Sequence, residues 1–195
     1  MFRLSRWLWV AGLAVVLVGC AHSPQQLNVK PGVVTAPLSQ VARQQPVVVT
    51  VQDSRSSPVL GTRGGLYPDT SNLTINPRAI EHVRQEVEQA LGKLGFQVVP
   101  QGTPNANNLV VSLAELSYIS PKEGVYVTQA DISAAFSAEV RSMNQRYTGR
   151  YSASMQQRFG YAPNQATNTR LVTEVMSDAL SRIFRDPEIL RILQQ

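Results

Sequence analysis

The most regular feature of the chain is an alternation of apolar and polar side chains in its second half. Every even position from 130 to 140 is apolar, and in 147–155 the apolar residues fall on odd positions. A period of two is typical of a strand with one buried and one solvated face. For both apolar sets to share a face, opposite residues must have numbers summing to about 287, as Val140 and Tyr147 do. The pattern predicts a long antiparallel hairpin with strands over 125–141 and 146–158.

Three further segments are predicted to be strands. Residues 46–53 are rich in β-branched side chains and apolar on both faces, which is typical of a strand well inside a sheet. Residues 96–99 form a short strand and 109–119 a longer one. The connection 54–75 is unusually long for a structureless loop, so it holds either an extra hairpin or a binding loop.

Helical spacing of apolar residues predicts two main helices. The first follows Asn76 as N-cap and stops near Gly95, and the second covers 171–184. A last short helix begins at Asp186, followed by proline. The order is then β-α-β-β-β-β-α-α. We expect an α+β fold, with an antiparallel-rich sheet of about five strands and two main helices packed on one face.

The first twenty residues differ from the rest of the chain. Two arginines precede a twelve-residue apolar run, and the run closes on Leu17-Val18-Gly19-Cys20. Twelve residues are too few for a membrane-spanning helix, so residues 1–19 are predicted to be a secretory signal. The ending resembles a bacterial lipobox, which implies cleavage before Cys20 and a diacylglycerol-modified cysteine. Removing this segment lowers the net charge from +5 to +3, with 16 basic and 13 acidic residues.

The predicted anchor decides the expected compartment. Ala21 follows the cysteine, and by resemblance to bacterial lipoproteins the absence of Asp there favours the periplasmic leaflet of the outer membrane over the inner membrane. That compartment excludes nucleic acid as a partner. Residues 20–45 are expected to be the lipidated N-terminus and a tether of roughly 27 Å if flexible, although Leu27 and Val29 could dock as an edge strand. Residues 46–195 would form a single periplasmic domain.

Residues suited to catalysis or metal binding are scarce. The chain has one cysteine and two histidines, His22 in the predicted tether and His82 on the polar side of the first helix. One cysteine excludes an intramolecular disulfide and any zinc site with two cysteine ligands. No catalytic constellation is found around the histidines. We therefore expect no enzymatic activity, no metal and no cofactor.

The end of the strand at 46–53 and the loop after it form a candidate binding region. Asp53 and Arg55 lie on the same side of the chain, either as a charged pair facing a cleft or as a pair that fixes the turn. The glycine-rich stretch Gly61-Thr62-Arg63-Gly64-Gly65 could form an anion-binding nest, although it lacks the ending of a P-loop. A mobile loop is the default interpretation.

A second candidate is the polar face of the long hairpin. Four arginines share it, Arg141, Arg146, Arg150 and Arg158. One interpretation is a basic surface for an anionic partner. Because acidic residues are interleaved with them, the other is an ordinary solvated face that discourages edge pairing.

Several sequence features in the same order suggest a family. They are the lipobox, Val-x-Val-x-Asp-x-Arg at 49–55, Leu60-Gly61 in the following loop, Leu94-Gly95-Phe96 at the helix end, and the long hairpin. With these features the chain resembles the YajG-type lipoproteins of Gram-negative bacteria over nearly all of its mature length. That resemblance implies a cell-envelope lipoprotein and no catalytic residues.

Three functions are consistent with these observations. The first is a membrane-anchored, non-enzymatic binding or accessory module for an envelope protein or peptidoglycan. The second is a peptidoglycan hydrolase, which would use Asp53. The third is a carrier for an amphiphile held between the sheet and the helices.

Overall fold

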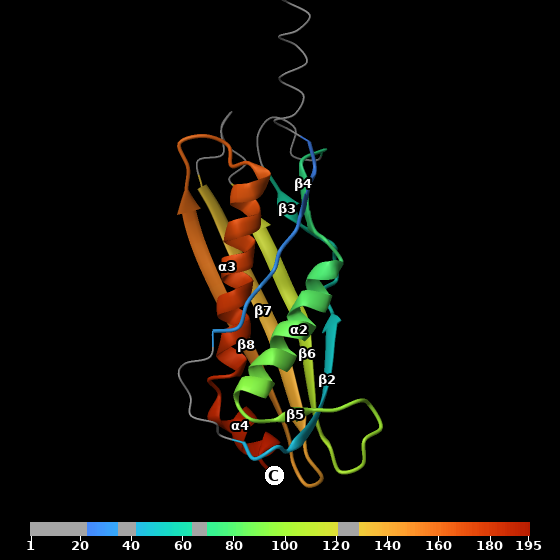
Figure 1. Cartoon of the computed structure of the whole chain (residues 1–195). Helices are drawn as coiled ribbons and strands as arrows, with labels where there is room; N and C mark the ends of the chain where they lie inside the picture. Colours follow the sequence, from blue (N-terminus) through green and yellow to red (C-terminus); the bar gives the residue numbers. More distant parts are fainter. Residues whose placement is uncertain (1–22, 35–41, 64–69, 121–128) are drawn as a thin grey trace, which may run out of the picture.

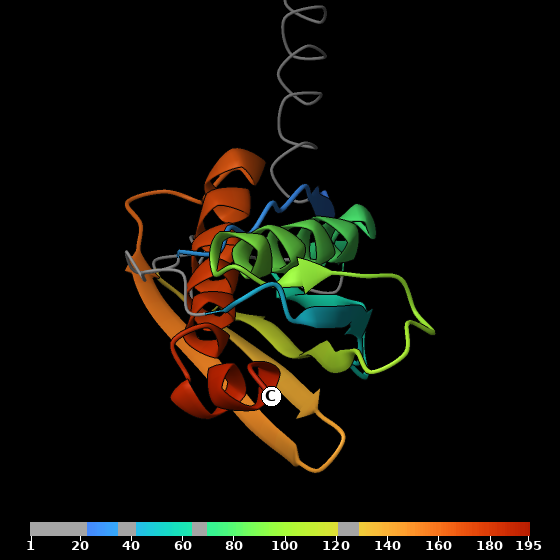
Figure 2. The same cartoon turned by 60° about the horizontal axis from the view of Figure 1, so that its bottom comes forward.

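The computed structural model describes residues 23–34, 42–63, 70–120 and 129–195. Within these ranges the chain forms one mixed sheet, with the helices packed on one of its faces (Figures 1 and 2). The strands are β1 (Gln25–Leu27), β2 (Pro46–Asp53), β3 (Val59–Thr62), β4 (Asn72–Ile75), β5 (Gln97–Val98), β6 (Asn107–Ile119), β7 (Gln129–Arg141) and β8 (Arg146–Arg158). The helices are α2 (Arg78–Lys93), α3 (Gln165–Ile183) and α4 (Pro187–Leu193). The α+β class and the one-sided helical layer are as the sequence predicts.

The predicted sheet of about five antiparallel-rich strands is wrong in strand number and in pairing. The described residues form eight strands, and four of their seven pairings are parallel: β1 with β4, β2 with β5, and β6 with both β2 and β3. The chain runs from β2 through the β3–β4 hairpin and then α2 to β5, and this crossover brings β2 and β5 side by side in parallel. Alternation identifies the buried face of a strand but not its neighbours, so the sequence pattern did not show this arrangement.

Strand β6 is the centre of the sheet. It pairs antiparallel with β7 along its length. It pairs parallel with β2 along its first half and with β3 near its end, where Gly61 lies opposite Tyr118. A β-bulge between Leu113 and Glu115 shifts the register. The bulge keeps both Leu113 and Leu116 buried although they are three residues apart, and it places Glu115 on the outer face.

The hairpin register is confirmed. In β7 and β8, Val140 lies opposite Tyr147 and Phe136 opposite Tyr151, so the apolar sets of both strands face the helices. Of the two alternatives for 54–75, the extra hairpin is observed, because β3 and β4 pair antiparallel.

Helix boundaries follow local signals. The Asn76 side chain accepts the N–H of Arg78, and the positive φ of Gly95 ends α2 with the N–H of Phe96 bonded to the carbonyl of Leu91. This ending is a Schellman motif. Helix α3 starts at Gln165, six residues before the predicted 171, capped by Asn164. Its first turns carry no apolar stripe, because the buried Asn168 is polar.

The N-terminal segment 23–34 lies across the helical layer between α2 and α3 (Figure 1). Leu27 and Val29 are fully buried in the same core as the helices, and β1 extends the sheet beside β4. The Oγ of Ser177 accepts the N–H of Gly32 at 3.0 Å. Docking as an edge strand is therefore the alternative that the structure shows for these residues.

Candidate functional site

The Asp53–Arg55 pair closes the turn after β2. The guanidinium donates two hydrogen bonds to the carboxylate, at 2.9 and 2.7 Å, and the N–H of Arg55 donates a third. The side-chain hydrogen bond from Arg55 holds the pKa of Asp53 below its ordinary value, outweighing the opposite effect of burial. The Arg55 side chain is only 7% exposed. A paired carboxylate with a lowered pKa fixes the turn and is poorly suited to act as a general acid.

Arg63 lies inside the fold. It is buried, and its guanidinium donates to the carbonyl oxygens of Ser23 at 3.2 Å and Pro163 at 3.3 Å. It thus joins the N-terminal segment to the β8–α3 connection and is not available as the exposed anion-binding residue of a loop. Gly64 and Gly65, the other predicted members of that loop, lie outside the described residues.

A buried polar pair lies beside Arg63. The Oη of Tyr118 donates to Oδ1 of Asn168 at 2.9 Å, and both side chains are almost completely buried. Burial raises the pKa of Tyr118 to about 12, with the nearby Arg63 charge acting in the opposite direction. Neither residue was among the predicted site residues, since the signal for this pair in the sequence is a polar residue among the buried positions of α3.

The four arginines of the candidate basic face lie on the outer face of the hairpin, opposite the helices, but most are neutralised. Arg141 and Arg146 both contact Glu139. The hydrogen bond from Arg146, the largest effect, lowers the pKa of that carboxyl, burial opposes it, and the hydrogen bond from Arg141 adds to the lowering. Arg150 pairs with Glu115 at 2.8 Å. The geometry therefore favours a polar face of mixed charge over a basic one.

Part of this outer face is hollowed. Two adjoining depressions, of about 590 and 320 Å³, follow β7 and β8, and we call them together the outer trough. Both are lined by Ser133 and Ser154 and open to solvent. Other lining residues are Glu115, Ser117, Ile119, Asp131, Ile132, Ala134, Ala135, Arg150, Ser152, Ala153, Met155, Gln156 and Arg182. The described helices all pack on the other face of the sheet, although α3 contributes the lining residue Arg182.

Small side chains make the trough. Ser152 and Ser154 of β8 lie opposite Ala135 and Ser133 of β7. The Oγ atoms of Ser133 and Ser117 are 2.7 Å apart, so the hydroxyls bridge β7 and β6 along the floor. The sequence signal for this site was available, since small residues occupy successive polar-face positions of the predicted hairpin, but their shared hollow is visible only once β6 is placed beside β7.

On the helical side, Asp186 links β8 to α4. Its Oδ2 accepts hydrogen bonds from Tyr151 at 2.5 Å and Tyr147 at 3.1 Å, and its Oδ1 accepts the N–H of Glu188. Burial favours a higher pKa for Asp186, but these hydrogen bonds outweigh it and the pKa is lowered. Burial and the Asp186 contact raise the pKa of Tyr151. The Asp186 carboxylate and the Tyr151 hydroxyl therefore hold each other in place, as expected of a structural contact.

The remaining predicted features concern the anchor and metal binding. Cys20 lies outside the described residues. Within the part of the chain that the structure describes, no helix has the length and apolar character needed to cross a bilayer. The same residues contain no cluster of three or more His, Cys, Asp or Glu side chains suited to a metal ion.

Comparison with known proteins gives a family and a fold. A family model described as "Uncharacterized lipoprotein" matches residues 33–194. No curated protein matches the chain. A crystal structure of a Xanthomonas campestris protein is similar with a TM-score of 0.51 at 11% identity, covering 83% of this chain and 92% of that one. This likeness supports the α+β architecture.

Two solved lipoproteins are also similar. The minor lipoprotein of Acinetobacter baumannii has a TM-score of 0.46 at 10% identity, and the match covers 79% of this chain and 98% of that one. The rare lipoprotein B of Shewanella oneidensis has a TM-score of 0.47 at 10% identity, with 71% and 91% covered.

Proposed function

The chain belongs to the uncharacterized lipoprotein family whose model spans residues 33–194, and from this premise we propose that it is a membrane-anchored, non-enzymatic binding module of the cell envelope. The family supports a lipoprotein with an envelope location. The narrower YajG-type assignment stays a prediction of the sequence. So does the outer membrane as the destination, which depends on Ala21 after the cysteine.

The anchor in this proposal is Cys20. Its thiol would carry a diacylglycerol group after removal of residues 1–19, and several acyl chains would make the attachment stable. Metabolic labelling with palmitate tests this directly, because a Cys20→Ser variant should lose the label. Both tryptophans, Trp7 and Trp9, lie in the segment to be removed. A processed protein should therefore show tyrosine-like fluorescence, whereas persistent tryptophan emission would contradict cleavage.

The outer trough is the observation that carries the binding function. It is an open polar hollow whose serine hydroxyls and rim charges can offer hydrogen bonds of both kinds to a partner. Binding sites typically combine a concave surface with a few convergent polar groups. The trough therefore suits a partner that inserts its own side chains between the rim residues.

A protein partner fits the trough better than a uniformly charged polymer. The Arg150–Glu115 pair and Asp131 place both signs of charge around it. Against an amphiphile carrier, the space between sheet and helices is filled by the buried apolar side chains of one continuous core. Against a hydrolase, the carboxylate of Asp53 is committed to Arg55.

Photo-crosslinking in intact cells tests the proposal. A photoreactive amino acid at Ser154, on the floor of the trough, should yield a discrete protein adduct, whereas the same group at exposed Gln89 on α2 should not. Replacing Ser133 with Trp should fill the trough and abolish the adduct of the Ser154 probe. The proposal of a protein partner would be contradicted if the probes at Ser154 and Gln89 gave the same adducts. It would also be contradicted if the only adduct contained sugar and no protein.

A further inference from the structure

The point where the chain enters the fold limits the distance between the domain and the membrane. Ser23 is held by its carbonyl, which accepts a hydrogen bond from the buried guanidinium of Arg63. Only three residue steps separate Ser23 from Cys20. Three steps of extended chain span at most about 11 Å. A domain anchored at Cys20 therefore has no tether of tens of ångströms, contrary to the length expected for a flexible 20–45 segment.

The end of the fold that contains Ser23 can be identified from its contacts. Arg63 bonds Ser23 and Pro163 with one guanidinium group, so the β8–α3 connection lies at the same end. The Oγ of Ser120 donates to the carbonyl of Thr62, which places the end of β6 there as well. We call this the entry end of the domain.

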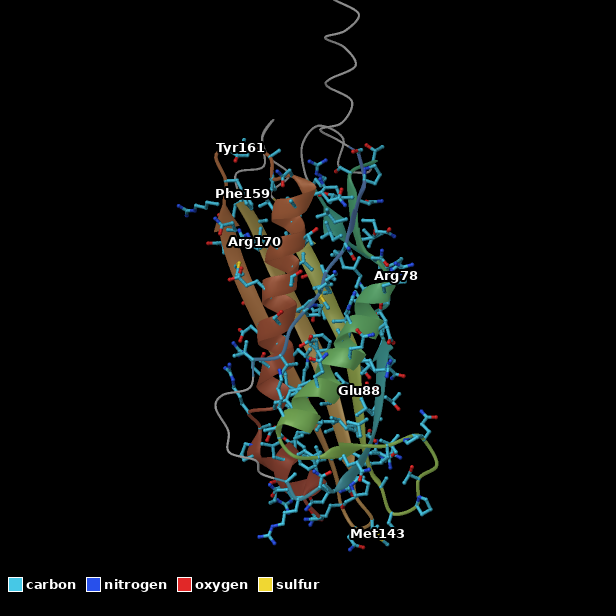
Figure 3. The ribbon with its side chains drawn as sticks, in the orientation of Figure 1. Arg78, Glu88, Met143, Phe159, Tyr161 and Arg170 are labelled. Carbon is cyan, nitrogen blue, oxygen red and sulfur yellow. The ribbon has the colours of Figure 1, made fainter. Side chains whose placement is uncertain are left out.

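The entry end exposes apolar side chains of the kinds found at membrane interfaces. Tyr161, two residues from Pro163, is 76% exposed, and Ile119, at the last position of β6, is 62% exposed. Phe159, two residues before Tyr161 in the chain, is partly buried against the core, and Figure 3 shows Phe159 and Tyr161 together at this end of the molecule. Tyrosine is enriched where protein meets lipid headgroups, because its ring is apolar and its hydroxyl is polar. Arg158, next in the chain, can approach lipid phosphates.

We propose that the entry end is a second membrane contact, at which Tyr161 and Ile119 rest in the lipid headgroup region beside the acylated cysteine. This inference rests on the proposed anchoring at Cys20. The acylated cysteine and the entry end act together on one rigid body, since the acyl chains keep Tyr161 and Ile119 at a high local concentration near the lipid. The contact fixes the orientation of the domain.

The orientation has a consequence for the outer trough. Strand β7 has 13 residues, so its ends are about 40 Å apart at strand rise. Met143, in the turn after β7, lies at the opposite end of the molecule from Tyr161 (Figure 3). The long strands then stand away from the membrane, and the trough faces sideways, with Ile119 at the end nearest the membrane and the part lined by Arg150 and Ser152 open to a partner.

Site-specific tryptophan fluorescence tests the contact. The mature chain has no tryptophan, so single variants Tyr161→Trp and Met143→Trp each give one reporter, both at exposed positions. Each full-length protein is processed, purified and reconstituted into vesicles of phosphatidylethanolamine and phosphatidylglycerol with brominated acyl chains. We expect the Tyr161→Trp reporter to be quenched at least twofold and shifted to the blue. The Met143→Trp reporter, about 40 Å away, should be unchanged.

Two separate readouts distinguish failure of this inference from failure of the proposed function. Vesicle flotation and the intact mass report whether Cys20 is acylated, and quenching reports whether the entry end touches lipid. Acylated, floating protein with an unquenched Tyr161→Trp reporter would overturn the second contact alone. Equal quenching of both reporters would overturn the orientation. Unacylated protein would remove the anchor and the inference together.

Discussion

The Oη of Tyr151 donates a 2.5 Å hydrogen bond to Oδ2 of Asp186, which connects the edge strand β8 to the residue that begins α4. The same oxygen accepts a hydrogen bond from Tyr147, while the other carboxylate oxygen caps α4 by accepting the N–H of Glu188. The partly buried carboxylate of Asp186 therefore contacts both β8 and α4. The contact fixes the end of the helical layer against the sheet.

Replacing Asp186 with Ala should destabilise the fold by about 1–3 kcal/mol, because the cap and the partner of both tyrosines are lost together. Urea denaturation at pH 7 measures the change in the free energy of unfolding. Asp178→Ala is the matched control, since Asp178 forms a half-exposed pair with Arg182 on α3 and such pairs contribute little. Equal effects from both variants would contradict the role assigned to Asp186.

Alkaline pH should destabilise the protein through Tyr118. Its pKa is raised from 10.0 to about 12, so the folded state keeps the proton that the unfolded chain releases first. The stabilisation is complete below pH 10 and is lost as the pH rises toward 12. Tyr118→Phe should cost about 1 kcal/mol at pH 7 through the lost bond to Asn168, and should lose less stability than the wild type between pH 10 and 12.

Urea titrations at pH 8, 10 and 11 measure this difference. The control is Tyr161→Phe, because Tyr161 is exposed and its replacement should leave the free energy of unfolding at pH 8 unchanged. A Tyr118→Phe variant with the same alkaline loss as the wild type would show that other groups are responsible.

Local signals in the sequence predicted local structure well. Alternation predicted the hairpin and its register, Gly95 and Asp186 marked helix ends where the structure has them, and Asn76 lies one residue before Pro77, the observed N-cap of α2. Strand neighbours were not predicted, because the parallel pairing of β2 with β6 depends on the path of the chain through α2 and β5. The short strands β1, β3 and β4 were left open because each has at most four residues, too few to show a period.

The candidate site was predicted only in part. The sequence analysis proposed the polar face of the hairpin, where the outer trough lies, but it counted arginines without their partners, and Glu115 comes from a different strand. It also placed Arg63 in an exposed loop, since nothing local distinguishes an arginine that bonds carbonyls 40 and 100 residues away in the chain. Contacts of this range depend on the completed fold.

Removing the acidic partner of Arg55 should destabilise the fold. Asp53→Ala leaves a guanidinium that is 7% exposed without its carboxylate, and we expect a loss of about 1–3 kcal/mol in the free energy of unfolding. Glu115→Ala is the comparison, because its pair with Arg150 is more than half exposed on both sides and should contribute less than about 1 kcal/mol. Chemical denaturation of both variants checks the order. A larger loss for Glu115→Ala would contradict it.

Gly61 should tolerate no side chain. A Cβ built there would lie 1.8 Å from the carbonyl oxygen of Tyr118, and the residue has a φ of +154°. Gly61 also forms the pairing that joins β3 to β6, so displacing it would loosen β1, β3 and β4 from the central strand. Gly61→Ala should therefore cost at least about 2 kcal/mol.

Gly92 supplies the opposite case. It lies in the last turn of α2, and a Cβ there would meet nothing within 4 Å. Gly92→Ala should raise the free energy of unfolding by about 0.5–1 kcal/mol, because alanine restricts the unfolded chain more than glycine does. The midpoint of thermal denaturation should thus move in opposite directions in Gly61→Ala and Gly92→Ala.

Hydrogen exchange tests where the fold loosens in Gly61→Ala. Exchange should become faster in β4 before it does in β7, whose pairing with β6 does not involve Gly61. Uniform acceleration in both strands would instead show that β3 and β6 unfold as one unit.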